Sequence, residues 1–254
     1  MNQYKNIKVK YISDLKLLIN KKLPDDWIII NSSQNAWVAK NIKENLYFKL
    51  FLKRNRLENI KTIFLGSRAK RFVKSCYKLL TNGFLAPNPI IWSSEIFAIL
   101  KGESWVITNA IEGQGVFDFW CNKMAYESIH QKKKFLTELA KVIAELHNRG
   151  FIHGDLRLNN ILVKETCDLW SFSFIDNEKN KFISKNSKRL FKLRCKNLVQ
   201  MNKAIHNSIR DKDRLTFFIA YSRFSNLNKH KRKELLYKII SLTNKWKQKK
   251  YYKL

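Results

Sequence analysis

Short apolar runs separated by polar residues dominate the first third of the chain. The run Trp-Ile-Ile-Ile begins at Trp27, and the polar stretch Asn31 to Asn35 separates it from the next run, so it is typical of a strand that ends in a turn. Four later runs have the same character. We therefore expect five strands in the first 110 residues, over residues 27–30, 36–39, 46–51, 89–92 and 105–110.

Two segments show helical rather than alternating spacing. Residues 67–80 carry apolar side chains three and four positions apart, with Ser67 as a candidate N-cap and Gly83 beyond the end. Residues 132–149 carry a broad apolar stripe that Gly150 terminates. The chain after Asn180 contains no glycine and is predicted to be helical and basic.

The order of these elements indicates an α+β chain in two parts. Strands with one helix come first, and a mostly helical half follows. Gly113 and Gly115 lie between them and make residues 111–115 a candidate hinge. We therefore expect an N-terminal lobe over residues 1–111 and a C-terminal lobe over residues 112–254. Hydrophobic residues make up 45% of the chain, which is enough for a folded core.

The charge of the chain is strongly positive. There are 50 Lys and Arg against 20 Asp and Glu, and 23 of the basic residues but only 4 of the acidic ones lie between residues 178 and 254. Such an excess favours an anionic partner: a nucleic acid, a phosphate-rich ligand or an anionic membrane surface. No nucleic-acid-binding motif accompanies the charge, so nucleic acid ranks last among these partners.

Cysteine spacing and hydropathy indicate the cellular compartment and whether the chain is expected to span a membrane. The four cysteines form no C-x-x-C pair, so neither a zinc site nor a disulfide framework is expected, and free thiols suit a reducing cytosol. The first twenty residues lack the apolar core of a signal peptide, and no apolar run is long enough to cross a bilayer. We therefore expect any contact with a membrane to be binding at its surface.

The segment FIHGDLRLNNILV, residues 151–163, carries the candidate chemistry. His153, Asp155 and Asn160 have H-x-D-L-x-x-x-N spacing, and Asp176 follows a second apolar run. Phosphoryl transfer needs a carboxylate near the attacking hydroxyl and oxygen ligands for magnesium. This pattern resembles the catalytic loop and metal-binding aspartate of kinases. It predicts Asp155 as the base and Asn160 and Asp176 as Mg²⁺ ligands, with Arg157 neutralising phosphate charge and His153 bracing the loop.

The N-terminal lobe supplies the candidate nucleotide-binding residues. Lys49 lies inside an apolar strand, where a charge is costly unless it has a function, and is assigned to the phosphates of ATP. The polar turn with Asn31, Ser32 and Ser33 takes the place of a phosphate-covering loop, and Asn109 completes the set.

Two features depart from protein kinases. No glycine lies between Pro24 and Leu65, so the glycine-rich loop is missing. Residues 59–94 contain no acidic residue, and Phe72 occupies the helix position at which a kinase has the glutamate that pairs with the strand lysine. The second departure puts that ion pair in doubt.

Four features together resemble the bacterial lipopolysaccharide core kinases, which phosphorylate Kdo or heptose. They are YFKLF around Lys49, GSRAKR followed by NGFLAPNP, the pair HGDLRLNNILV and FSFID, and the basic C-terminal region with KNLVQMNKA and RLTFFIAYSRF. The resemblance extends from about residue 28 to residue 224. It implies a two-lobed protein-kinase-like fold, ATP and Mg²⁺ as cosubstrates, and an anionic glycolipid acceptor, the lipopolysaccharide core. It also implies a cytoplasmic enzyme, peripheral on the inner membrane.

Other readings of the same residues stay open. HGDL-x-x-x-N also occurs in small-molecule kinases and in atypical protein kinases. The first class usually has a longer helical insertion after the hinge, with acidic residues for cationic substrates, whereas the corresponding region here, residues 117–134, is short and the whole chain is basic. The second class should have a serine- and glycine-rich loop before the lysine strand, which this chain lacks. The missing glycines and glutamate would also suit a non-catalytic pseudokinase, against which the intact Asp155, Asn160 and Asp176 argue.

Overall fold

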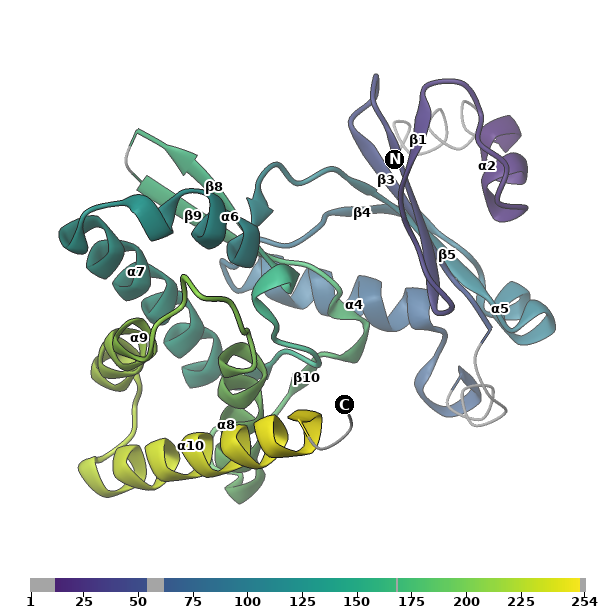
Figure 1. Ribbon diagram of the computed structural model, residues 1–254. Coiled ribbons are helices and arrows are strands. Elements are labelled where there is room, and N and C mark those ends of the chain that lie inside the picture. Colours follow the sequence, from purple (N-terminus) through teal and green to yellow (C-terminus); the bar gives the residue numbers. More distant parts are fainter. Residues whose placement is uncertain (1–11, 54–61, 168, 252–254) are drawn as a thin grey trace. The chain divides into compact units, whose positions relative to one another are not determined.

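The structure, a computed structural model, describes residues 12–53, 62–167 and 169–251. The chain divides into two compact units, Met1–Ile111 and Glu112–Leu254 (Figure 1). Each unit has its own hydrophobic core. This is expected for a chain in which short strands come first and long amphipathic helices follow.

The first unit is built on a five-stranded antiparallel sheet. The strand order is β1-β2-β3-β5-β4, so β3 is central and Lys49 on it is paired with Val38 and Val106 of its two neighbours. Apolar side chains at alternate positions fill the core on one face, where Phe48 and Leu50 are fully buried. The strands are β1 (Trp27–Ser32), β2 (Ala36–Asn41), β3 (Leu46–Phe51), β4 (Pro89–Trp92) and β5 (Ser104–Asn109).

Helices accompany the sheet in this unit. Helix α2 (Ile12–Ile19) packs Leu18 into the core, and α4 (Arg68–Thr81) begins where the Ser67 hydroxyl accepts a hydrogen bond from the Lys70 amide. Helix α5 (Glu95–Lys101) ends at Gly102, whose left-handed backbone (φ 69°) suits glycine.

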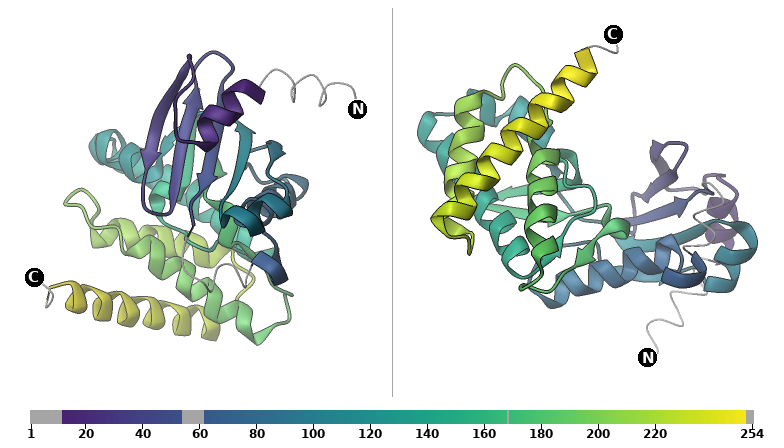
Figure 2. Two further views of the ribbon diagram at one scale, coloured as in Figure 1. Left: turned by 90° about the vertical axis from the view of Figure 1, so that its right-hand side faces the viewer. Right: turned by 90° about the horizontal axis from the view of Figure 1, so that it is seen from below.

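The second unit packs helices around a small strand hairpin. The Phe135 ring of α7 lies 5.3 Å from the Trp170 ring and 5.7 Å from the Phe172 ring, centroid to centroid, so this helix holds the hairpin β8–β9 in place. Helix α10 runs along α8 (Figure 2). The elements are α6 (Val116–Asn122), α7 (Ile129–Asn148), α8 (Lys188–Asn202), α9 (Asp211–Phe224), α10 (Lys229–Tyr251), β6 (Gln114–Gly115), β7 (Phe151–Ile152), β8 (Ile161–Thr166), β9 (Leu169–Phe174), β10 (Lys181–Phe182) and short 3₁₀ turns at Met124–Tyr126, Leu158–Asn160 and Asn177–Lys179.

Most of the expected elements are confirmed: the strands at 46–51 and 89–92 have the expected ends, and the ends of the others differ by at most three residues. One prediction was wrong: Asn31 and Ser32 belong to β1 and not to the turn, because the pairing with β2 continues to Ser32. The Ser33 hydroxyl caps the shorter turn by accepting from the amides of Asn35 and Ala36. Helix α5 was not expected at all. None of the helices in the described residues is long and apolar enough to span a membrane.

Candidate active site

Asn160 and Asp176 are sixteen positions apart in sequence, and the hairpin β8–β9 brings them to the same end. Ile161 at the start of β8 is paired with Phe174 at the end of β9, and the Ile175 amide donates to the Asn160 carbonyl over 3.0 Å. Asn160 therefore precedes one strand, and Asp176 follows the other, at the same end of the hairpin. Asp176 adopts a left-handed backbone (φ 63°), which aspartate tolerates better than most residues.

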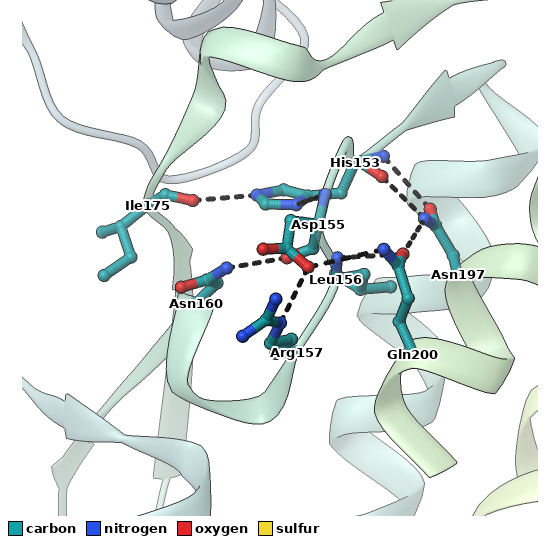
Figure 3. A network of polar contacts seen from close by, with 8 residues as sticks. All are labelled: His153, Asp155, Leu156, Arg157, Asn160, Ile175, Asn197 and Gln200. Atoms are coloured by element: carbon teal, nitrogen blue, oxygen red, sulfur yellow. Dashed lines mark hydrogen bonds and ion pairs between the residues drawn. The ribbon is translucent and has the colours of Figure 1, made fainter. Parts of the chain in front are cut away.

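The loop between β7 and β8 holds Asp155 by its backbone and by its carboxylate. The Asn160 side-chain amide donates to the Asp155 carbonyl over 2.8 Å. Arg157 Nε lies 2.9 Å and Gln200 Nε2 3.4 Å from the same carboxylate oxygen, Oδ1 of Asp155 (Figure 3). The structure thus brings Asp155, Arg157 and Asn160 into one network.

His153 braces this loop, as predicted. Its Nδ1 accepts from the Asp155 amide over 3.1 Å, so its Nε2 carries the proton and donates to the Ile175 carbonyl over 2.8 Å (Figure 3). The ring is 2% exposed, and burial lowers its pKa below the usual value. A neutral His153 therefore joins the catalytic loop to the segment that carries Asp176.

Gly154, next to Asp155, is required by close packing. A Cβ at this position would lie 2.1 Å from the Cβ of Lys179 and 2.5 Å from its carbonyl oxygen. The Gly154 amide donates instead to the side chain of Asn180 over 3.1 Å. The position of Asp155 therefore depends on this glycine, because any larger residue at position 154 would displace the backbone.

Helix α8 supplies two residues that sequence reasoning did not assign to the site. The Asn197 side chain is 1% exposed; its oxygen accepts from the His153 amide, and its nitrogen donates to the His153 carbonyl over 2.6 Å. Gln200 accepts from the Leu156 amide over 3.2 Å and from the Asn197 side chain over 3.0 Å. Both lie in KNLVQMNKA, which carried the family resemblance but gave no sign of contact with Asp155.

The network continues from Asn197 into the core. His147 Nε2 donates to the Asn197 oxygen over 3.1 Å, and its Nδ1 accepts from the Tyr221 hydroxyl over 2.9 Å. His147 is fully buried, and desolvation together with the nearby Arg194 charge lowers its pKa to about 3. The imidazole is therefore neutral in the folded protein at neutral pH.

This buried imidazole predicts acid sensitivity. The pKa of His147 is lower in the folded state than the ordinary 6.5, so the unfolded state binds the extra proton between pH 6.5 and about 3. The contribution of His147 to stability is fully present above pH 6.5 and is lost as the pH falls toward about 3, by up to about 5 kcal/mol. Denaturant unfolding at a series of pH values should show this loss in the wild type, and a smaller one in His147→Gln. Parallel curves for the two proteins would contradict the prediction.

A groove of about 590 Å³ opens beside the loop. Asp155, Arg157 and Asn160 line one side of it, together with Gln200. The remaining lining comes from α6, from the segment that follows α8, and from α10. These residues are Phe117, Lys203, Ala204, Ile205 and Trp246, together with Leu158 and Asn159 of the loop. A concave surface with a few convergent polar groups is the usual form of a small-molecule site.

The predicted nucleotide-binding residues lie in the first unit. Lys49 Nζ is 5.0 Å from the centroid of the Phe51 ring and 5.8 Å from that of Phe72, both within the range of cation–π attraction. Phe72, on the buried face of α4, thus lies against the lysine where a kinase glutamate was expected. Asn31 and Ser32 are exposed near the end of β1, Ser33 is in the turn, and Asn109 is exposed at the end of β5.

Side chains suited to a hard cation are few. Among the described residues, no three His, Cys, Asp or Glu side chains come together as a metal site. Asn160 and Asp176 offer one amide and one carboxylate at the end of the hairpin. Two such oxygen ligands fit a Mg²⁺ ion that takes its other ligands from phosphates and water, as is usual for this metal.

Comparison with known proteins gives one family and one fold. A family model described as the lipopolysaccharide kinase (Kdo/WaaP) family matches residues 34–221. The structure described as "WaaP in complex with acyl carrier protein" is similar with a TM-score of 0.62 and 14% identity, over 91% of this chain and 95% of that one. No curated protein matches the sequence. The structural likeness confirms the α+β protein-kinase-like fold expected from the sequence.

Proposed function

Because the chain belongs to the lipopolysaccharide kinase (Kdo/WaaP) family and is therefore a kinase, we propose that it transfers the γ-phosphate of ATP to a Kdo or heptose hydroxyl of the lipopolysaccharide inner core. The observation that carries this proposal is the network on one loop and one hairpin end, in which Asp155 and Asn160 are linked directly and His153 ties them to the segment before Asp176. Phosphoryl transfer needs little covalent chemistry beyond such positioning.

Asp155 would orient the acceptor hydroxyl and receive its proton. Arg157 and Gln200 both donate to Oδ1, which fixes the carboxylate and would leave Oδ2 to face the hydroxyl. Arg157 has an exposed side chain and would exchange part of its contact with Asp155 for the phosphate under transfer. These two residues are the proposed catalytic pair.

Asn160 and Asp176 would hold the divalent cation, proposed as Mg²⁺. The amide nitrogen of Asn160 is used by the Asp155 carbonyl, so the amide oxygen is the atom available to a metal. When bound, the cation would offset the charge that develops on the phosphate oxygens. The protein's part is to hold two oxygen ligands at a fixed separation by pairing β8 with β9.

The first unit, residues 1–111, would bind the nucleotide, and the second, residues 112–254, would bind the acceptor and carry out the transfer. Lys49 would bind the phosphates of ATP, with Asn31, Ser32, Ser33 and Asn109 as further nucleotide contacts. The rings of Phe51 and Phe72 lie against the Lys49 ammonium group and restrict where it can point.

The acceptor would be met at the cytoplasmic face of the inner membrane, with the protein as a peripheral enzyme. Helix α10 supports this, since it carries nine Lys and Arg and a single Glu over 23 residues. Each basic residue near an anionic leaflet contributes about 1 kcal/mol of attraction. Pelleting with anionic vesicles, lost at high salt and absent with neutral vesicles, is the result that would support it.

Transfer of labelled γ-phosphate from Mg-ATP to purified, dephosphorylated core acceptors tests the proposed function. Label in a Kdo- or heptose-bearing glycolipid is the expected result, and the acceptor that takes it identifies the sugar. Nucleotide binding without transfer would favour a small-molecule or atypical protein kinase. Neither binding nor transfer would favour a pseudokinase and overturn the proposal.

A further inference from the structure

The groove beside Asp155 has a second wall for which the proposed reaction gives no role. This wall consists of Lys203 and Ile205, which follow α8, and of Trp246 on α10. Lys203 Nζ lies 5.3 Å from the centroid of the Trp246 ring, and both side chains are half-buried. The indole face thus holds the ammonium group at a defined place in the groove.

The second wall is fixed by a chain of hydrogen bonds. Arg214 of α9 donates to the carbonyls of Asn202 and Ala204, over 2.8 and 2.6 Å, and to the Asn202 side-chain oxygen over 2.9 Å. The nitrogen of the same Asn202 amide donates to the Thr243 hydroxyl of α10 over 3.0 Å. Residues on both sides of Lys203, and the helix that carries Trp246, are therefore held together.

Apolar packing holds α10 at the same place. Leu235 is fully buried, Ile239 and Thr243 are 7% and 3% exposed, and the three are spaced four residues apart on one face of the helix. Trp246 follows three residues after Thr243 and extends this face to the groove. Trp246 is therefore held by a packed helix, which positions a binding residue more precisely than a loop does.

The charges in the groove select the ligand. Asp155, Arg157 and Lys203 are the charged residues among those that line it, and Arg157 is paired with Asp155. Lys203 thus adds a positive charge apart from this pair, next to a flat aromatic face. An anionic group attached to a ring with an apolar face would satisfy both features.

We propose that Lys203 and Trp246 form the acceptor subsite and that it takes an acidic sugar. This inference rests on the proposed function, since it places the acceptor in the groove that contains Asp155. Lys203 pairs with the anion, the sugar ring lies against the face of Trp246, and the hydroxyl to be phosphorylated reaches Asp155. The anion is either a carboxylate of the sugar itself or a phosphate on the neighbouring residue of the glycolipid.

Steady-state kinetics of Lys203→Met and Lys203→Arg test the subsite. Methionine keeps an apolar stem against Trp246 but removes the charge, so the KM for the acceptor should rise by about tenfold or more, with kcat and the KM for ATP unchanged. Lys203→Arg should retain most of the affinity. Lys245→Met is the matched control. Lys245 lies on α10 next to Trp246, but its side chain is exposed and does not line the groove.

Modified acceptors identify the anion. The two modifications are a neutral amide in place of the sugar carboxylate and removal of the neighbouring phosphate, and the one that removes the partner of Lys203 should cost the wild type the same factor as Lys203→Met. The modification that removes the true partner should have no further effect in that variant, whereas the other should act in both proteins alike. Equal effects of Lys203→Met and Lys245→Met, or additivity with both modifications, would overturn the subsite.

Direct binding separates this inference from the proposed function. If the wild type transfers no phosphate to any core acceptor, titration calorimetry with a glycolipid that keeps both its sugar carboxylate and its neighbouring phosphate still tests the groove. Binding that Lys203→Met loses and Asp155→Asn retains would support the subsite in the absence of transfer. No binding to the wild type would overturn the subsite as well.

Discussion

Asp155→Asn is expected to lower kcat for phosphate transfer by about 100-fold to 10,000-fold, the range that a general base contributes. The amide is nearly isosteric with the carboxylate, and its oxygen still accepts from Arg157 and Gln200. It cannot, however, take up the proton of the acceptor hydroxyl, and it carries no negative charge to orient that hydroxyl. The KM values for ATP and acceptor should change little, because neither ligand is bound through the proton-accepting oxygen.

Two controls make the Asp155 result specific. Asp211→Asn removes a carboxylate that is 97% exposed at the start of α9, so it changes the net charge equally and should leave kcat unaltered. The unfolding temperature of Asp155→Asn should lie near that of the wild type. Full activity in Asp155→Asn would remove Asp155 as the base and leave the loop network with a structural role only.

Asp176→Asn is expected to abolish the magnesium-dependent part of nucleotide binding. Asp176 is the only carboxylate of the proposed metal pair, and its replacement leaves two neutral amides, which are poor ligands for Mg²⁺. Titration of ATP with and without magnesium should show at least about a 10- to 100-fold loss of affinity in the presence of the ion and little change in its absence. Transfer activity should fall with it.

Lys49→Met provides the contrast for Asp176. The loss of the Lys49 ammonium should weaken ATP binding both with and without magnesium, since its proposed contact is with the phosphates and not with the metal. The methionine can still pack against Phe51 and Phe72, so the sheet should be preserved. If Asp176→Asn binds magnesium-ATP as the wild type does, Asp176 is not a metal ligand, whatever the result for Lys49.

Local patterns were sufficient to predict the elements of the fold that bury one regular face. The 67–80 helix has a capping serine and apolar residues in phase, and it forms one residue later as α4. Helix α5 has the same kind of end signals, Ser94 before it and Gly102 after it, but of its seven residues only Ala98 is buried, while Ile96, Ile99 and Leu100 are exposed. Its apolar residues have helical spacing but no core to face, so periodicity gives no sign of where it packs.

The residues of the candidate site also fall into two groups, those that local spacing predicts and those that it does not. Asp155, Asn160 and Asp176 are recognised from spacing because the loop and hairpin that position them are local in sequence. Gln200, Lys203 and Trp246 reach the groove from helices 45 to 91 residues beyond Asp155. No short-range pattern could predict their contacts, since these depend on how α8 and α10 pack.

The bonds between Asn197 and His153 also bear on the order in which the protein acquires its structure. The two residues are 44 positions apart, and Gln200, which holds the Leu156 amide, comes three residues later still. During synthesis from the N-terminus, the segment with Asp155 emerges well before the helix that fixes its backbone, and long-range contacts of this kind form late. A nascent chain that ends before residue 197 therefore contains the whole HGD sequence but cannot yet hold it in its final conformation.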